Sequence, residues 1–128
     1  MATLYLDTHA AVWLYAGRTN LLGARYRRAL ADNTNLLVSP MVALEIAYLQ
    51  ETGRLTEGPT EILHRLHLDF AVTTCHATFH LIAAEACRLA WTRDPFDRII
   101  VAHASLHATP LATRDRDIHA NFSLALWD

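Results

Sequence analysis

Residues 4–10, Leu4-Tyr5-Leu6-Asp7-Thr8-His9-Ala10, pass without a linker from an apolar strand into a helix. We expect the strand over residues 3–6 and the helix over residues 8–16, closed by Gly17. An aspartate at such a junction can cap the helix, or it can present a carboxylate at the end of the strand. The stretch therefore predicts an α/β unit and makes Asp7 a candidate site residue.

The rest of the chain repeats this alternation. Further strands are expected over residues 36–38, 70–73, 111–113 and, at an edge, 124–127. Further helices are expected over residues 23–31, 40–52, 59–68, 76–91 and 95–108, two of them opened by the pairs Ser39-Pro40 and Asp94-Pro95. Strands that alternate with helices of this length predict a parallel sheet covered on both faces.

Length and composition narrow the field. The 128 residues suit one domain, residues 1–128, and the 52% hydrophobic content suits an ordinary core. No apolar run is long enough to span a membrane, and Cys75 and Cys87 do not form a disulfide framework. We therefore expect a cytoplasmic protein with buried, reduced thiols.

The basic residues have an unusual composition. All 11 are arginines, and the chain has no lysine. The net charge of −2 argues against a strongly basic nucleic-acid binder, although arginine is the side chain suited to bidentate phosphate contacts. Surface solubility and ion pairing remain the alternative role for most of these arginines.

Glu45 is a second acid in an apolar setting. On a helical wheel it points away from a side that we expect to face solvent, formed by Ala43, Ala47, Gln50 and Glu51. It lies instead among Met41, Leu44, Tyr48 and Leu49. Because no basic residue lies within one turn, a functional role is favoured over a buried ion pair.

Two further acids follow in the second half of the chain. Asp97 lies in the first turn of a nearly apolar helix, where it can complete a capping box with Asp94 or serve a site. Asp115 follows the expected strand over residues 111–113, and Asp117 comes two residues later, so either is the possible fourth acid. Carboxylates in apolar surroundings are costly unless paired or metal-bound, and Mg²⁺ prefers oxygen ligands. Their convergence at one sheet edge predicts a metal-dependent phosphate enzyme.

Four segments together resemble a PIN domain, and more narrowly the VapC-type ribonuclease toxins of toxin–antitoxin pairs. They are L-Y-L-D-T-H-A (4–10), S-P-M-V-A-L-E-I-A (39–47), R-D-P-F-D-R-I-I-V-A-H-A (93–104) and P-L-A-T-R-D-R-D (110–117). The resemblance runs from residue 3 to about residue 127. It implies a three-layer α/β/α sandwich with a central parallel sheet of four to five short strands.

The resemblance also implies a site and an activity. The family's four acids fall on Asp7, Glu45, Asp97 and Asp115, which are expected to hold one or two Mg²⁺ or Mn²⁺ ions and to activate water for RNA cleavage. Substrate contacts are expected from two threonines and several arginines: Thr8, Thr113, Arg93, Arg98, Arg114 and Arg116. Ion pairing with Asp94 or Asp117 remains the alternative for any one arginine.

The partners implied are an RNA substrate, a small VapB-like antitoxin and a second copy in a homodimer. The strip Trp13, Leu14 and Tyr15 is a candidate for part of an apolar groove for the antitoxin.

Other acid-pocket folds fit less well. A response-regulator receiver and a P-loop enzyme both need a lysine, and a haloacid-dehalogenase-type phosphatase needs an acid where this chain has His9. The remaining rival is a PIN-like module that binds RNA or protein without cutting. A complete set of four acids argues against it, because clustered negative charge repels phosphates.

Overall fold

Five strands form one parallel sheet in the computed structural model, which describes residues 2–128. The order across the sheet is β3-β2-β1-β4-β5, and every neighbouring pair is parallel. The strands are β1 (Thr3–Leu6), β2 (Asn35–Val38), β3 (Thr73–Thr74), β4 (Leu111–Ala112) and β5 (Ala125–Leu126). This confirms the predicted parallel sheet of short strands, with β5 at an edge.

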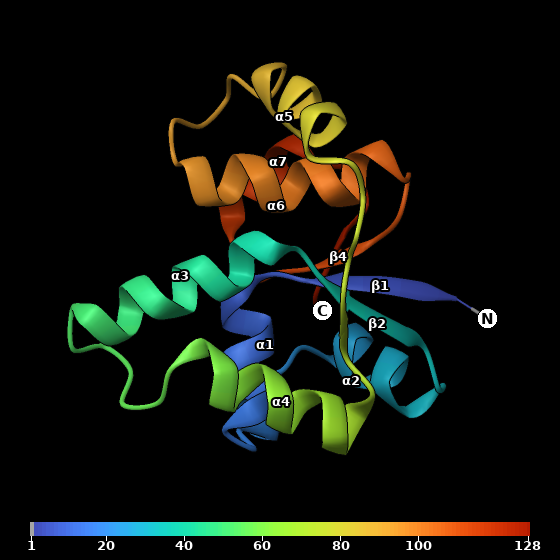
Figure 1. Ribbon diagram of the computed structural model, residues 1–128. Coiled ribbons are helices and arrows are strands. Elements are labelled where there is room, and N and C mark those ends of the chain that lie inside the picture. Colours follow the sequence, from blue (N-terminus) through green and yellow to red (C-terminus); the bar gives the residue numbers. More distant parts are fainter. Residues whose placement is uncertain (1) are drawn as a thin grey trace.

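Helices cover both faces of the sheet (Figure 1). One layer consists of α1 (Thr8–Tyr15), α2 (Ala24–Ala31) and α4 (Pro59–Phe70), with the short 3-10 turn η1 (Thr19–Leu21) between α1 and α2. The other consists of α5 (Phe79–Cys87), α6 (Pro95–Leu106) and α7 (Arg116–Asn121). Helix α3 (Pro40–Glu51) extends outward between the layers and contacts α4 and α6. The three-layer α/β/α prediction is therefore confirmed.

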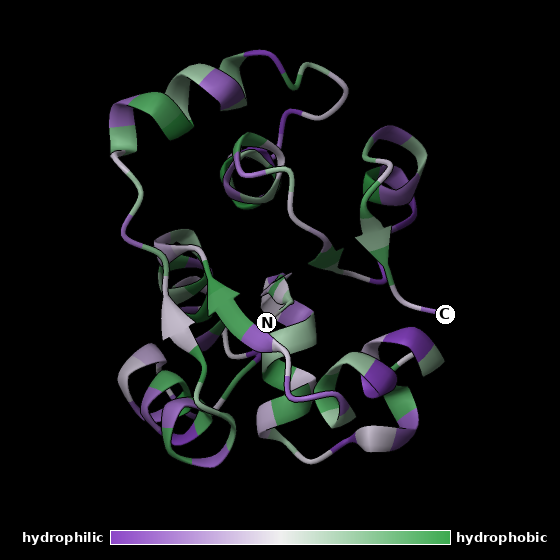
Figure 2. Cartoon of the chain, turned by 90° about the vertical axis from the view of Figure 1, so that its right-hand side faces the viewer, coloured by the Kyte–Doolittle hydropathy of each residue, from purple (hydrophilic) through white to green (hydrophobic). Residues whose placement is uncertain are grey.

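The central strand β1 anchors the core. Leu4 and Leu6 are fully buried, and α1 and α2 are joined beneath the sheet by the Tyr26 hydroxyl, which donates to the carbonyl of Ala10 at 3.0 Å. In Figure 2 green hydrophobic residues run along β2 after its polar first residue, whereas purple residues gather on loops and the outer sides of helices. This pattern matches a sheet buried on both faces.

The order of the strands locates a crevice. Chain connections from β1 lead to β2 and β3 on one side, whereas β4 and β5 lie on the other side of β1. Ligands of open α/β sheets bind at such a reversal, outside the carboxyl ends of the strands. Asp7 directly follows β1, and Asp115 lies three residues after β4. The fold therefore directs both acids to the same place.

The sequence prediction is wrong for residues 70–78. Helix α4 continues to Phe70, where a strand was expected, and then ends at Ala71 in a left-handed conformation, with φ of 56°. Strand β3 is reduced to Thr73–Thr74, and α5 begins only after Thr78. The chain must turn at Ala71 to reach the sheet edge, and no propensity rule marks that alanine.

The expected helix over residues 76–91 is also too long. Helix α5 ends at Cys87, and the chain then turns so that Leu89 and Trp91 pack against the main core. Two short elements, α7 and η1, were not predicted. Both cysteines are free, but Cys87 is exposed, contrary to the expectation of two buried thiols. Within residues 2–128 every helix is too short or too polar to cross a lipid bilayer.

Candidate active site

Asp7 caps a helix and lines a pocket at the same time. It is the N-cap of α1, and its Oδ1 accepts from the backbone N–H of Ala10 at 2.9 Å. The residue is only 9% exposed. Burial raises its pKa to about 6 from 3.8, although hydrogen bonds from Thr113 and from Ala10 act in the opposite direction. The two roles that the sequence left open for Asp7 are compatible.

Asp97 is relieved of the capping role by its neighbour. The Asp94 side chain caps α6, accepting from the backbone N–H groups of Phe96 at 2.8 Å and of Asp97 at 3.3 Å. The N–H of Asp94 itself donates to the Thr92 hydroxyl at 3.2 Å, so no reciprocal capping box forms. The carboxylate of Asp97 is therefore available to the pocket that it lines.

The electrostatics of Asp97 show that the acids crowd one another. Its pKa is raised to about 7 from 3.8, first by burial and then by the neighbouring carboxylates Asp94, Asp115, Glu45 and Asp7. Repulsion between like charges favours the protonated form of the group that feels it. A cation in the pocket would relieve this repulsion.

Glu45 reaches the pocket, but not for the reason given by the helical wheel. The buried side of α3 consists of Val42, Ile46 and Leu49. Leu44 is 57% exposed and Tyr48 49%, so two of the four apolar residues expected around Glu45 face outward. The half-buried Glu45 lies at the border of these two sides, and its Oε1 accepts a hydrogen bond from the hydroxyl of Thr8.

Asp115, and not Asp117, is the fourth acid of the pocket. Asp115 is the N-cap of α7, accepting from the backbone N–H groups of Asp117 at 2.8 Å and Ile118 at 3.0 Å. Its own N–H donates to the hydroxyl of Thr113 at 3.1 Å. Asp117 is an exposed acid in the first turn of α7, outside the lining of the pocket.

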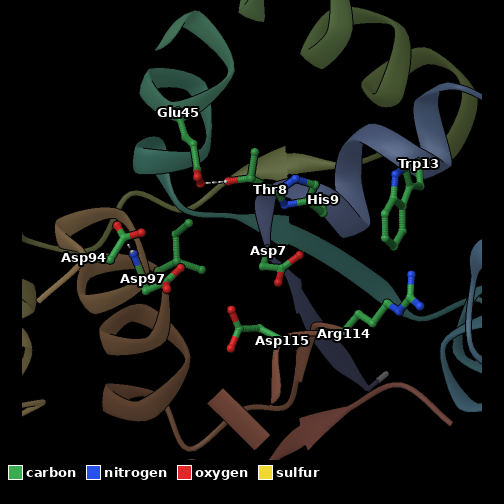
Figure 3. A pocket seen from close by; sticks show the side chains of 10 residues that line it. Asp7, Thr8, His9, Trp13, Glu45, Asp94, Asp97, Arg114 and Asp115 are labelled. Atoms are coloured by element: carbon green, nitrogen blue, oxygen red, sulfur yellow. Dashed lines mark hydrogen bonds between the residues drawn. The ribbon is translucent and has the colours of Figure 1, made fainter. Parts of the chain in front are cut away.

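These side chains meet in a cavity of about 420 Å³ (Figure 3). Its lining from residues 2–128 contains five carboxylates and one guanidinium: Asp7, Glu45, Asp94, Asp97, Asp115 and Arg114. His9 and Trp13, four positions apart on α1, complete the lining together with the buried residues Thr8 and Ile100. Sequence reasoning missed His9, and it assigned Trp13 to a partner groove. The i, i+4 spacing after Asp7 is the signal that could have placed both residues here.

The carboxylate oxygens of the pocket suit a divalent ion that keeps several bound waters better than one coordinated by protein atoms alone. Among residues 2–128 no three acidic, histidine or cysteine side chains lie close enough to ligate one ion together. Mg²⁺ commonly keeps several waters and binds through one or two carboxylates. An open pocket of oxygen donors with excess negative charge fits that mode of binding.

The two threonines lie behind the acids. Thr8 is 2% exposed and its hydroxyl donates to Glu45. Thr113 has no exposed surface; its hydroxyl hydrogen-bonds to the carboxylate of Asp7 and accepts from the backbone N–H of Asp115. Any influence of Thr113 on a substrate must therefore pass through the carboxylate of Asp7 or the backbone of Asp115.

The arginines predicted to contact substrate do not all lie at the acid pocket. Arg114 lines the pocket, but its guanidinium lies over the ring of Trp13, 5.8 Å from the ring centroid, and extends away from Asp115 (Figure 3). The Nε of Arg98 donates to the carbonyl of Thr92 at 2.7 Å, and Arg93 is exposed. The alternative of pairing with Asp94 or Asp117 is wrong, because the ion pairs within residues 2–128 are Arg65–Asp69 and Arg88–Glu85.

The sequence and the structure were compared with known proteins, and the matches agree with one another. A sequence model of the PIN domain matches residues 4–122. Ribonuclease VapC22 of Mycobacterium tuberculosis is 29% identical over 122 residues, which cover 94% of this chain and 93% of that protein.

Solved structures share the fold. A toxin–antitoxin complex from Klebsiella pneumoniae superposes with a TM-score of 0.66 at 19% identity, covering 98% of this chain and 97% of the other. VapBC2 from Rickettsia felis, solved with a promoter DNA fragment, gives 0.66 at 18% identity, covering 98% and 99%. At such low identity the solved structures bear on the fold alone.

Proposed function

The chain belongs to the PIN domain family, and on that premise we propose that it is a VapC-type toxin, a metal-dependent endoribonuclease. The observation that supports this most is the excess of carboxylates in one pocket, together with the raised pKa of Asp97 among them. The similarity to a protein named a ribonuclease supports the choice of RNA as substrate.

The four acids divide the work of holding the ion. Asp7, Glu45 and Asp97 are proposed to hold a first Mg²⁺ or Mn²⁺, one or two of them directly and the rest through its bound waters, and Asp115 binds a second ion or orients water. A bound ion supplies an activated water and stabilises charge on the scissile phosphate. In-line attack then leaves a 5′-phosphate and a 3′-hydroxyl.

The surrounding residues position these groups. Thr8 fixes the carboxylate of Glu45, and Thr113 hydrogen-bonds to Asp7. Arg114, held over Trp13, is the guanidinium in the described lining of the pocket and would contact a phosphate that enters it. Arginine suits this task because its planar guanidinium makes two parallel hydrogen bonds to a phosphate.

A protein partner is proposed as well. Relatives of this fold have been solved as toxin–antitoxin complexes, and this chain exposes apolar side chains on α3 and α5, including Leu44, Tyr48 and Phe79 at 57%, 49% and 66%. We assign these exposed groups to contacts with a VapB-like antitoxin or with a second copy in a homodimer, in the cytoplasm. The expected groove on α1 is less suitable, because Leu14 is core and Trp13 lines the acid pocket.

The rival function is an inactive PIN-like module that binds RNA or protein. It gives no reason for an acid on each of four separate elements to point into one cavity. Such a module would bind RNA without cleaving it, both with and without divalent ions.

The direct test is cleavage of a structured RNA by purified protein. We expect cleavage with Mg²⁺ or Mn²⁺, loss of cleavage with EDTA, and loss of cleavage in the Asp7→Asn variant under all conditions. Asp32→Asn, which changes an exposed acid after α2, is the matched control and should cleave normally. Cleavage that persists in Asp7→Asn would contradict the assignment. Tight RNA binding without cleavage would favour the rival module.

A further inference from the structure

A second cavity, of about 570 Å³, adjoins the acid pocket and has the opposite charge. It lies where α2, the start of α7 and the end of the chain after β5 meet. Three arginines line it, Arg25, Arg114 and Arg116, together with His119, Trp127 and Asp128. Arg114 belongs to the lining of both cavities, so the two cavities are neighbours on one surface.

The arginines of this cavity are not neutralised from within. Among residues 2–128 none of the three lies within 4.0 Å of a carboxylate oxygen, since the ion pairs found there involve Arg65 and Arg88. Asp128 is the one acid in the lining, against three guanidinium groups. A chain whose net charge is −2 therefore concentrates positive charge directly beside its acid pocket.

The fold holds the two walls of the cavity in place. The N–H groups of Arg25 and Tyr26, at the start of α2, donate to the carbonyl of Trp127 at 3.0 and 3.2 Å. A Cβ on Gly23 would lie 2.2 Å from that oxygen, so only glycine allows this close approach. On the opposite wall, the His119 ring hydrogen-bonds to the carbonyl of Thr113 at 2.7 Å. The arginines thus extend from backbone that is fixed on both sides.

The position of Arg114 links the two cavities. Its guanidinium is supported by the face of Trp13 (Figure 3), and Arg114 lines both the acid pocket and the basic cavity. A polyanion with one phosphate at the acid pocket must send its neighbouring phosphates outward from there. On the Arg114 side they would meet the cavity lined by three arginines.

We propose that this basic cavity binds backbone phosphates of the RNA strand on one side of the scissile bond, with Arg25 and Arg116 as its principal contacts. The inference rests on the proposed function and makes RNA binding asymmetric about the cut. The phosphates on one side of the scissile bond contact the arginines of the basic cavity, and those on the other side do not. Phosphate contacts of this kind set register and affinity without reading base sequence.

The test uses one RNA oligonucleotide with a single mapped cleavage site. In Arg25→Gln and Arg116→Gln we expect KM to rise roughly tenfold each, as for the loss of a hydrogen bond to a charged group, with kcat unchanged. The slope of log affinity against log salt should fall by about 0.7 for each phosphate that the variant no longer neutralises. Arg27→Gln, on the same helix but exposed and outside the cavity, is the matched control and should behave as the wild type.

Neutral methylphosphonate linkages, introduced one at a time, locate the phosphates. In the wild type the rise in KM should be confined to one side of the cut, and the Arg25→Gln/Arg116→Gln double variant should lose this sensitivity. A symmetric effect, or unchanged KM and salt slope in both arginine variants, overturns the proposal. So does a variant with normal RNA kinetics that fails to bind the antitoxin, because the cavity would then serve a protein.

Measurements of RNA binding test the basic cavity independently of whether the protein cleaves RNA. If the wild type cleaves no RNA, fluorescence anisotropy with an end-labelled RNA still reports on the cavity. The Arg25→Gln/Arg116→Gln change should weaken binding in the Asp7→Asn background, whereas Arg27→Gln should not. Equal binding of these forms would overturn the basic cavity as an RNA site, whatever the catalytic result.

Discussion

The hydroxyl of Thr8 donates a hydrogen bond to the carboxylate of Glu45, 37 positions further along the chain. The bond ties the first turn of α1 to the middle of α3, two helices that approach each other at the carboxyl end of the sheet. It also fixes the one acid of the pocket that comes from an outlying helix. Thr8 is therefore a positioning residue for Glu45.

Replacing Thr8 by valine tests this role. The shape of the side chain is kept, but the donor to Glu45 is lost, so we expect Mn²⁺ affinity to fall by roughly 10- to 100-fold, as for other partners of metal ligands. Thr8→Ser retains the hydroxyl and should recover most of the affinity. Calorimetric titration measures both variants. Equal affinities for the valine and serine forms would contradict a positioning role.

The stability of the metal-free protein should depend on pH through Asp7 and Asp97. Their folded-state pKa values of about 6 and about 7 lie above the ordinary 3.8, so ionisation of either group opposes folding. The stability that they contribute is complete below pH 3.8 and is lost as pH rises through about 6 and about 7.

The Asp97→Asn variant removes one of these titrations. Its free energy of unfolding should exceed that of the wild type by an amount that grows as pH rises from 3.8 to about 7 and then stays constant. Urea denaturation in EDTA across that range is the measurement. A difference that does not change with pH would mean that Asp97 is not held among other carboxylates.

Gly23→Ala should destabilise the fold through a backbone clash. The new Cβ would lie 2.2 Å from the carbonyl oxygen of Trp127, and relief requires α2 to move away from the end of the chain. Overpacking of this kind costs about 1–3 kcal/mol. At Gly58 a Cβ would meet the flexible side chain of Gln50, at 2.7 Å, so Gly58→Ala should cost less. Thermal denaturation compares the two, and a larger loss for Gly58→Ala would contradict the argument.

Much of the fold could be predicted because its signals are local. The run from Leu4 to Thr8 and the Ser39-Pro40 and Asp94-Pro95 caps each determine a strand end or a helix start within a few residues. The end of α4 at Ala71 and the end of α5 at Cys87 depend instead on where the chain must return to the sheet and the core. That information is not present in the neighbouring residues.

The site was predicted in part for the same reason. Sheet topology directed Asp7 and Asp115 to one edge. The wheel correctly turned Glu45 away from solvent, but it placed Leu44 and Tyr48 wrongly because it assumed one buried side for a helix that contacts both α4 and α6. Asp97 could not be separated from a capping role until Asp94 was seen to cap α6. The contact of Arg114 with Trp13 joins residues 101 positions apart, and no spacing rule indicates it.

The central claim is that the carboxylates of one pocket hold the ion on which cleavage depends. Calorimetric titration of the metal-free protein with Mn²⁺ tests it most directly. We predict one or two ions per chain in the wild type, with protons released on binding near pH 6 to 7, where Asp7 and Asp97 titrate. Binding should be lost in Asp7→Asn and in Asp97→Asn and kept in Asp32→Asn. Equal binding by all four proteins, or binding by none, would contradict the account.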